Sequence, residues 1–76
     1  MSYQNYQINF SFNGIATPAF VAKMSKEISK LTGCKTEVLS YLNFKIQDCA
    51  LTTAQIKNIL KDAYSIFKMN VSIKIV

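Results

Sequence analysis

Cys34 and Cys49 are the only thiols of the chain and the residues best able to do chemistry. A pair of thiols can form a reversible disulfide, and as thiolates it can hold a soft metal ion such as Cu(I). A hairpin that turns at Tyr41 and Leu42 would bring the two cysteines roughly opposite each other. Free cysteines more often behave as small buried hydrophobes. The sequence leaves three alternatives open, a buried pair, a redox pair and a two-thiolate metal site, and it favours the first.

Few other residues offer chemistry. The 76-residue chain contains no His, which is the commonest acid–base group and metal ligand at neutral pH. No nucleophile elbow, glycine-rich phosphate loop or close pair of carboxylates occurs in it. We therefore expect a protein that is not an enzyme, has no catalytic residue and no metal site of the usual kind, and needs no cofactor. The four acids are scattered: Glu27, Glu37, Asp48 and Asp62.

Lysine dominates the charge of the chain. The nine basic residues are all lysines and give a net charge of +5, which favours acidic partners or polyanions. Lys23, Lys26 and Lys30 fall along one side of a predicted helix, and Lys57 and Lys61 do so on a second. A purely solvated surface is the plain alternative. We expect the two lysine faces to lie side by side and to form a basic docking surface for an acidic protein.

The hydrophobic pattern divides the chain into alternating strands and helices. Period-two alternation predicts strands at residues 4–13 and 70–76. Helical spacing predicts helices at residues 18–32 and 53–67. Residues 34–49 alternate less regularly and predict a hairpin that turns near Ser40–Leu42.

Capping residues mark the expected helix ends. Thr17 is a suitable N-cap, Pro18 suits the first helical turn, and Gly33 supplies a left-handed stop. Thr52 and Gln55 form a capping-box pattern before the second helix. The order βαββαβ predicts an α+β fold, the ferredoxin-like two-layer sandwich, in which a four-stranded antiparallel sheet carries two helices on one face. Because no linker or repeat is visible, we expect residues 1–76 to be a single domain.

Each predicted helix has an apolar stripe for the core, and the first strand has an apolar face. The first strand is expected to bury Tyr6, Ile8, Phe10 and Phe12. The first helix is expected to bury Phe20, Val21, Met24, Ile28 and Leu31. The second helix is expected to bury Ile56, Ile59, Leu60, Ala63 and Phe67.

The other face of the predicted sheet is polar, and Tyr41 is the one aromatic side chain that could be exposed there. RNA-recognition domains share the βαββαβ order, but they stack bases on aromatic residues of this face. The chain also lacks Arg, so nucleic-acid binding is not favoured. The face is expected to be wetted, and it could also mediate dimerisation. Its residues are Asn5, Gln7, Asn9, Ser11, Asn43, Lys45, Gln47, Ser72 and Lys74.

The stretch from Phe10 to Tyr64 resembles the heavy-metal-associated domain, the fold of small copper chaperones. In that family a strand is followed by a Gly-Met-x-Cys-x-x-Cys loop and by a helix that ends in Gly. Here the loop is Gly14-Ile15-Ala16-Thr17-Pro18-Ala19-Phe20, and Gly33 ends the helix. The family's two metal-binding cysteines would fall at Thr17 and Phe20, which offer no thiolate to a soft metal. The resemblance therefore implies the scaffold without its usual metal ligands.

This resemblance leads us to expect a small binding module that docks a protein partner through the loop and the lysine faces. The plain alternative for the loop is that Thr17 and Pro18 only begin the helix and that Ile15 and Phe20 pack inward. The expected contact residues are Ile15, Ala16, Thr17, Ala19, Lys23, Lys26, Lys30, Lys57, Lys61 and Tyr64. One alternative is a soft-metal carrier with a non-standard site that uses Cys34, Cys49 or a Met. A second alternative is a weak nucleic-acid binder.

The sequence also suggests where the protein works. Two cysteines are too few for a disulfide scaffold, so we expect a reducing compartment, the cytoplasm. The longest apolar run, residues 15–22, is interrupted by Thr17 and Pro18 and is too short to span a bilayer. We expect no membrane insertion, and a monomer or a weak homodimer.

Overall fold

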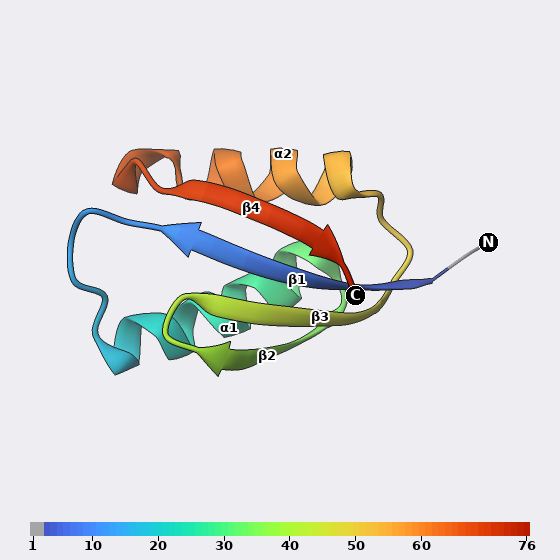
Figure 1. The fold of residues 1–76 in the computed structure, drawn as a ribbon, viewed down its shortest axis with the longest axis horizontal. Helices are drawn as coiled ribbons and strands as arrows, with labels where there is room; N and C mark the ends of the chain where they lie inside the picture. Colours follow the sequence, from blue (N-terminus) through green and yellow to red (C-terminus); the bar gives the residue numbers. More distant parts are fainter. Residues whose placement is uncertain (1–2) are drawn as a thin grey trace.

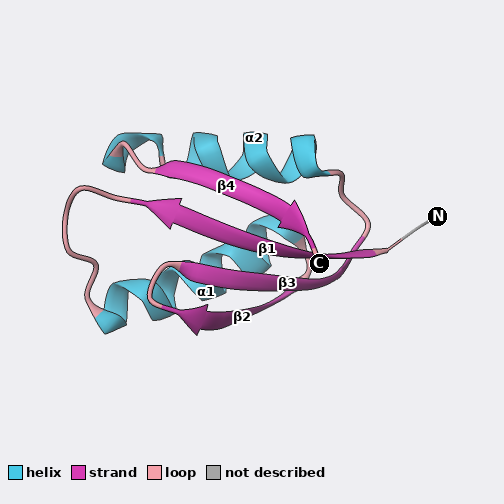
Figure 2. Ribbon diagram, in the orientation of Figure 1, coloured by secondary structure: helices cyan, strands magenta, loops and turns pink. Residues whose placement is uncertain are grey.

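The computed structural model describes residues 3–76, which form one sheet and two helices (Figure 1). The sheet has the strand order β2-β3-β1-β4, and every neighbouring pair is antiparallel. Both helices cover the same face of the sheet (Figure 2). The predicted α+β, ferredoxin-like two-layer sandwich is confirmed. The elements are β1 Gln4–Ser11, α1 Pro18–Thr32, β2 Lys35–Ser40, β3 Asn43–Cys49, α2 Thr53–Ala63, the 3-10 helix η1 Ser65–Phe67, and β4 Asn70–Ile75.

The predicted caps hold both helices. The Thr17 hydroxyl accepts a hydrogen bond from the Phe20 N–H, and Gly33 ends α1 with a φ of 70°. At the start of α2, Thr52 and Gln55 bond to each other's backbone N–H groups, so the capping box is complete. Residues 3–76 contain no helix that is both long and apolar enough to cross a membrane.

The hairpin turns at Tyr41–Leu42, as predicted. The register shifts between Val38 and Ser40, so Leu39 is an extra residue that breaks the alternation of β2. Leu42 is buried although it lies in the turn, and its carbonyl accepts a hydrogen bond from the Phe10 N–H at 3.0 Å.

The second helix is shorter than predicted. It ends at Ala63, and Ser65–Phe67 form a separate 3-10 helix that stops at Lys68, whose φ of 57° is left-handed. Because the chain changes direction at Tyr64, Ala63 and Phe67 are exposed rather than buried. The predicted burial of these two residues is wrong.

The first helix is rotated slightly from its predicted face. Leu31 is 45 % exposed, whereas Thr32 is buried. The Thr32 hydroxyl donates to the Ile28 carbonyl at 2.7 Å and accepts from the Cys34 N–H at 3.3 Å. A hydroxyl bonded in this way can be buried at little cost, which the apolar pattern alone does not reveal.

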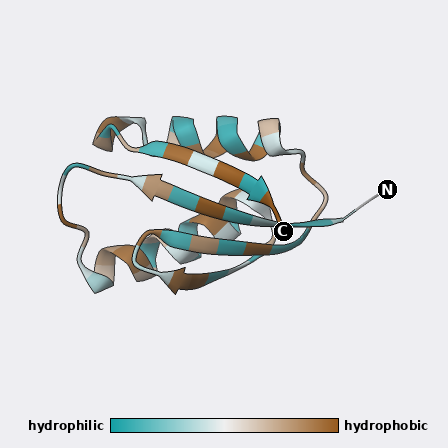
Figure 3. Cartoon of the chain, in the orientation of Figure 1, coloured by the Kyte–Doolittle hydropathy of each residue, from teal (hydrophilic) through white to brown (hydrophobic). Residues whose placement is uncertain are grey.

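The core lies between the sheet and the helices, and Figure 3 shows apolar and polar residues alternating along the strands. Phe10 is its aromatic centre, with ring centroids 5.8 Å from Phe44 and 5.4 Å from Tyr64. Each fully buried aliphatic or aromatic side chain stabilises the fold by roughly 1.5–3 kcal/mol. The largest fully buried side chains are Phe44, Ile8, Met24, Ile28, Ile46, Ile56, Leu60 and Cys49.

Candidate binding surface at the loop end

The two ends of the sandwich are formed by different residues. The loop end is formed by residues 12–17, 41–42 and 65–67 and lies at the left of Figure 1. The cysteine end lies opposite it, where Cys34 precedes β2 and Cys49 ends β3. The residues that the sequence singled out for partner contact are mostly at the loop end or on α1.

The loop between β1 and α1 is held in place by hydrogen bonding and close packing. The Ala16 N–H donates to the Tyr41 hydroxyl at 2.8 Å, which ties the loop to the hairpin turn. A Cβ on Gly14 would lie 2.7 Å from Cζ of Phe12, so the ring packs against a position that only glycine fits without movement. A loop fixed in this way loses little conformational entropy when it binds a partner.

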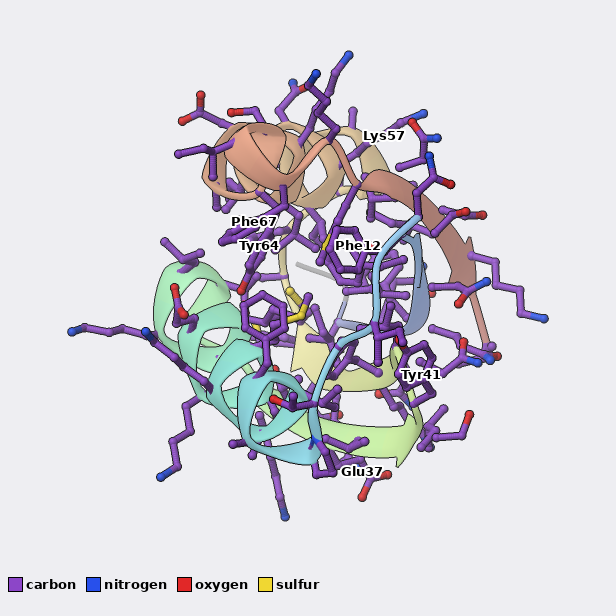
Figure 4. The ribbon with its side chains drawn as sticks, turned by 90° about the vertical axis from the view of Figure 1, so that its left-hand side faces the viewer. Phe12, Glu37, Tyr41, Lys57, Tyr64 and Phe67 are labelled. Atoms are coloured by element: carbon purple, nitrogen blue, oxygen red, sulfur yellow. The ribbon has the colours of Figure 1, made fainter. Side chains whose placement is uncertain are left out.

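Two apolar hollows flank this loop. One has a volume of about 230 Å³ and is lined by Phe12, Ile15, Thr17, Phe20 and Phe67. The other has a volume of about 340 Å³ and lies between α1 and β2, with Ala16, Pro18, Val21, Ala22, Val38 and Tyr41 as its lining. The rings of Phe20 and Phe67 meet edge to face at 5.4 Å and join α1 to η1. Figure 4 views the molecule from this end, with Phe12, Phe67 and Tyr41 labelled.

Large apolar side chains are exposed at the loop end. Ile15 is 91 % exposed at the tip of the loop, and Ile66 is 81 % exposed in η1. Tyr41 and Phe67 are also exposed, at 55 % and 41 %. A gathering of exposed apolar side chains, in contrast to scattered single ones, is typical of an interaction surface.

The structure keeps some of the predicted contact residues at the surface and removes others. Ile15, Thr17 and Ala19 are exposed, as expected. Ala16 and Tyr64 are only 6 % and 3 % exposed, so their prediction as contact residues is wrong. Ala16 belongs to the hydrophobic core, and the Tyr64 ring packs edge to face against Phe10 in the same core.

Sequence reasoning missed four residues of the loop end. The sequence places Tyr41 at the hairpin turn, predicts Phe12 and Phe67 as core residues and gives no role to Ile66. Helical spacing gives no signal for Ile66, because it follows Ile59 by two helical turns and so lies at the edge of the predicted stripe. No glycine or proline in the sequence indicates the 3-10 turn that exposes Ile66 and Phe67.

Tyr64 lies beneath this surface, between the two helices. Its hydroxyl is buried and has no hydrogen-bond partner among residues 3–76. Burial raises the pKa of Tyr64 to about 12, and the nearby carboxylate of Glu27 adds to the rise. The hydroxyl therefore stays neutral over the physiological range.

The two lysine faces were predicted to lie side by side, but they are separate in the structure. Lys57 and Lys61 line a hollow with Asn70 and Val71 of β4, and Figure 4 shows Lys57 on the side of α2 that faces away from α1. Lys23, Lys26 and Lys30 are exposed along α1, over the other half of the sheet. The fold therefore has two separate basic regions instead of one.

Cys34 and Cys49 adjoin at the cysteine end, and both are free thiols. Cys49 is fully buried, and the half-buried Cys34 donates from its thiol to the Thr32 carbonyl at 3.3 Å. Burial raises the pKa of Cys34 to about 11, and the Cys49 thiol adds to the rise. This shift is opposite to the one that activates a nucleophilic or metal-binding thiol. No three His, Cys, Asp or Glu side chains within residues 3–76 gather in a way that could hold a metal ion.

The open face of the sheet has a hollow of different character. Its volume is about 300 Å³ and its lining is polar: Gln7, Asn9, Asn43, Ser72 and Lys74. None of these residues can stack on a base, so the surface lacks the aromatic platform of single-strand binders.

A scan against models of protein families finds no match, and searches of curated proteins and of solved structures find none either. The resemblance to the heavy-metal-associated domain therefore depends on the loop, the glycines and the apolar spacing alone. At the positions of the family's metal ligands, Thr17 caps α1 and Phe20 packs on Phe67, and both line an apolar hollow.

Proposed function

We propose that the protein is a non-enzymatic interaction module that binds a protein partner at the loop end. The observation that carries this proposal is the hollow of about 230 Å³, with Ile15 and Phe67 exposed at its rim. Exposing these side chains to water is unfavourable, so a partner that covers them gains binding free energy. Apolar pockets with exposed aromatic neighbours are the usual centres of protein interfaces.

The rigidity of the loop supports the same proposal. Tyr41 fixes Ala16 at 2.8 Å, Thr17 caps the helix, and Phe12 packs on Gly14. These contacts present the side chain of Ile15 from a loop that is already ordered, and preorganisation raises affinity by lowering the entropic cost of binding.

The charge of the surroundings suggests an acidic partner. Lys23 lies one turn beyond Phe20 on α1, and Lys68 directly follows η1. With a net charge of +5, the molecule attracts acidic surfaces at long range, and salt weakens this attraction. We expect the partner segment to carry an apolar residue for the hollow, flanked by Asp or Glu.

Selection from a displayed peptide library against the immobilised protein would test this function. Selected peptides should bind wild type and Leu31→Glu equally, because Leu31 is an exposed apolar residue at the far end of α1, away from the hollow. They should bind Ile15→Glu at least about tenfold more weakly, as for loss of an interface anchor. Equal binding to wild type and Ile15→Glu would contradict the proposal.

A further inference from the structure

The sheet has two edge strands, β2 and β4, whose outer backbone groups face no neighbouring strand. An edge strand offers N–H and C=O groups to any additional strand, and proteins commonly protect such edges with charge. The two edges differ in their charges, which determines what each can pair with.

The β4 edge is protected against a second copy of itself. Lys57 and Lys61 of α2 line the hollow beside Asn70 and Val71, and Lys74 lies within the strand. Asn70–Ile75 contains Lys74 and no acid, so two such edges cannot form an opposite-charge pair, and an axis at Lys74 would set lysine against lysine. Like charges that face each other across paired strands are destabilising.

The β2 edge carries charges of both signs and exposed apolar residues. Val38 and Leu39 are 43 % and 48 % exposed. Val38 pairs with the buried Phe44, so Val38 and Thr36 lie on the helix-covered face. Lys35 and Glu37 therefore share the open face, because side chains alternate along a strand. Figure 4 shows Glu37 extending from β2 into solvent, away from the rest of the molecule.

We propose that a second copy of this chain pairs antiparallel with β2, with the two-fold axis at Thr36. This register places Lys35 opposite Glu37 of the second copy, and the symmetry repeats the pair on the other side of the axis. It also places the two Thr36 residues opposite each other. Opposite-charge and Thr–Thr pairs are both favourable across antiparallel strands.

Neighbouring registers that keep the faces in phase fit less well. An axis at Glu37 would set two carboxylates opposite each other, which is unfavourable. An axis at Val38 would set Glu37 against Leu39 and leave the lysine without its partner. Within the chain Lys45 is the register neighbour of Glu37 across β2 and β3, so in the proposed dimer the strand position of Glu37 lies between those of two lysines.

The dimer joins two four-stranded sheets into one continuous sheet through their β2 edges. A closed two-fold contact of this kind uses the same patch on both copies, so it stops at two. β2 has six residues, so the interface is at the small end of specific interfaces and the association is weak.

Sedimentation equilibrium under reducing conditions, at concentrations up to about 1 mM, reaches the range in which a millimolar Kd is visible. We expect wild type to dimerise there. Glu37→Lys and Lys35→Glu should each weaken the dimer about tenfold, because each replaces two attractive pairs by two repulsive ones. The double variant Lys35→Glu, Glu37→Lys exchanges the charges and should restore the association.

Two controls make the outcome decisive. Lys74→Glu changes a charge on the other edge strand and should leave the dimer unchanged, and circular dichroism checks that each variant is folded. A monomer at every concentration would overturn the proposal. So would a dimer that ignores the single changes, or a double variant that stays monomeric.

The dimer is tested at Lys35 and Glu37 and the proposed partner surface at Ile15, so the two ideas fail separately. Ile15→Glu should retain self-association while it loses peptide binding. Glu37→Lys should retain peptide binding while it loses self-association.

Discussion

The loop end and the cysteine end use polar and apolar side chains in opposite ways. At the cysteine end, polar groups are occupied by internal hydrogen bonds: Ser29 donates to the Cys34 carbonyl at 2.8 Å, and Tyr6 to the Leu51 carbonyl at 2.6 Å. At the loop end, apolar side chains surround two open hollows. The two cysteines, which suggest chemistry, therefore belong to the packed end of the fold. The surface best suited to binding is built instead from side chains that carry no reactive group.

Of the substitutions that test this comparison, Cys49→Ser should change the free energy of unfolding most. Cys49 has no exposed surface, so a hydroxyl at its position is buried among apolar neighbours. Burying a hydroxyl without a good partner costs about 1–3 kcal/mol. We expect the free energy of unfolding, measured in urea, to fall by that amount.

Ile15→Ser is the matched control at the loop end. Ile15 is 91 % exposed, so its replacement should change the free energy of unfolding by no more than about 0.5 kcal/mol. If Cys49→Ser proved as harmless as Ile15→Ser, the description of the cysteine end as closed core would be wrong.

Replacing Tyr41 with Phe should have an intermediate effect, confined to the loop end. The change removes the acceptor of the Ala16 N–H and keeps the ring beside its hollow. Loss of one hydrogen bond costs about 0.5–1.5 kcal/mol. We expect hydrogen exchange of the Ala16 amide to accelerate by about tenfold and peptide binding at the loop end to weaken.

The exchange of the Gly33 amide serves as a reference for Tyr41→Phe. That amide donates to the Ser29 carbonyl at the other end of α1 and should be unaffected. Equal acceleration at Ala16 and Gly33 would mean that the change loosens the whole fold, and the loop would not be held by Tyr41.

The sequence was sufficient for the architecture because its local signals agree. Thr17 with Gly33 and Thr52 with Gln55 delimit the helices, and the alternation of the first strand selects its buried face. When capping, periodicity and turn position all indicate the same order of elements, few folds are compatible with them.

The register irregularities could not be predicted from the alternation. Phe44 and Ile46 point inward, so strict alternation would bury Asp48 next. Asp48 instead adopts a φ of 50°, and its N–H is bonded to the Asn5 side chain at 3.0 Å. This bulge turns the charge outward and buries Cys49. An isolated Asn–Asp contact between distant strands leaves no periodic trace in the sequence.

The candidate site was predicted in outline only. The exposure of Ile15 agrees with the expected docking loop and not with the alternative in which Ile15 packs inward. The place of Phe67 in the lining of the hollow was not predicted, because Phe67 continues the helical spacing of Ile56 and Leu60 although the helix has already ended. A tertiary contact, the burial of Tyr64, ends that helix and exposes the residues that follow.

Tyr64→Phe should have the smallest effect at neutral pH and a distinct one in alkali. The buried hydroxyl has no partner within residues 3–76, so its removal should leave the free energy of unfolding unchanged or raise it by up to about 1 kcal/mol.

In the folded protein the pKa of Tyr64 is raised from 10.0 to about 12, so the folded state favours the neutral phenol. That contribution is complete below pH 10 and is lost as the pH rises toward 12. Urea unfolding at a series of pH values should therefore show a shallower alkaline decline for Tyr64→Phe than for wild type, with the decline from Cys34 remaining in both, because its pKa is raised to about 11. Identical alkaline profiles would mean that the Tyr64 hydroxyl reaches water, and the interior beneath the loop end would then be open.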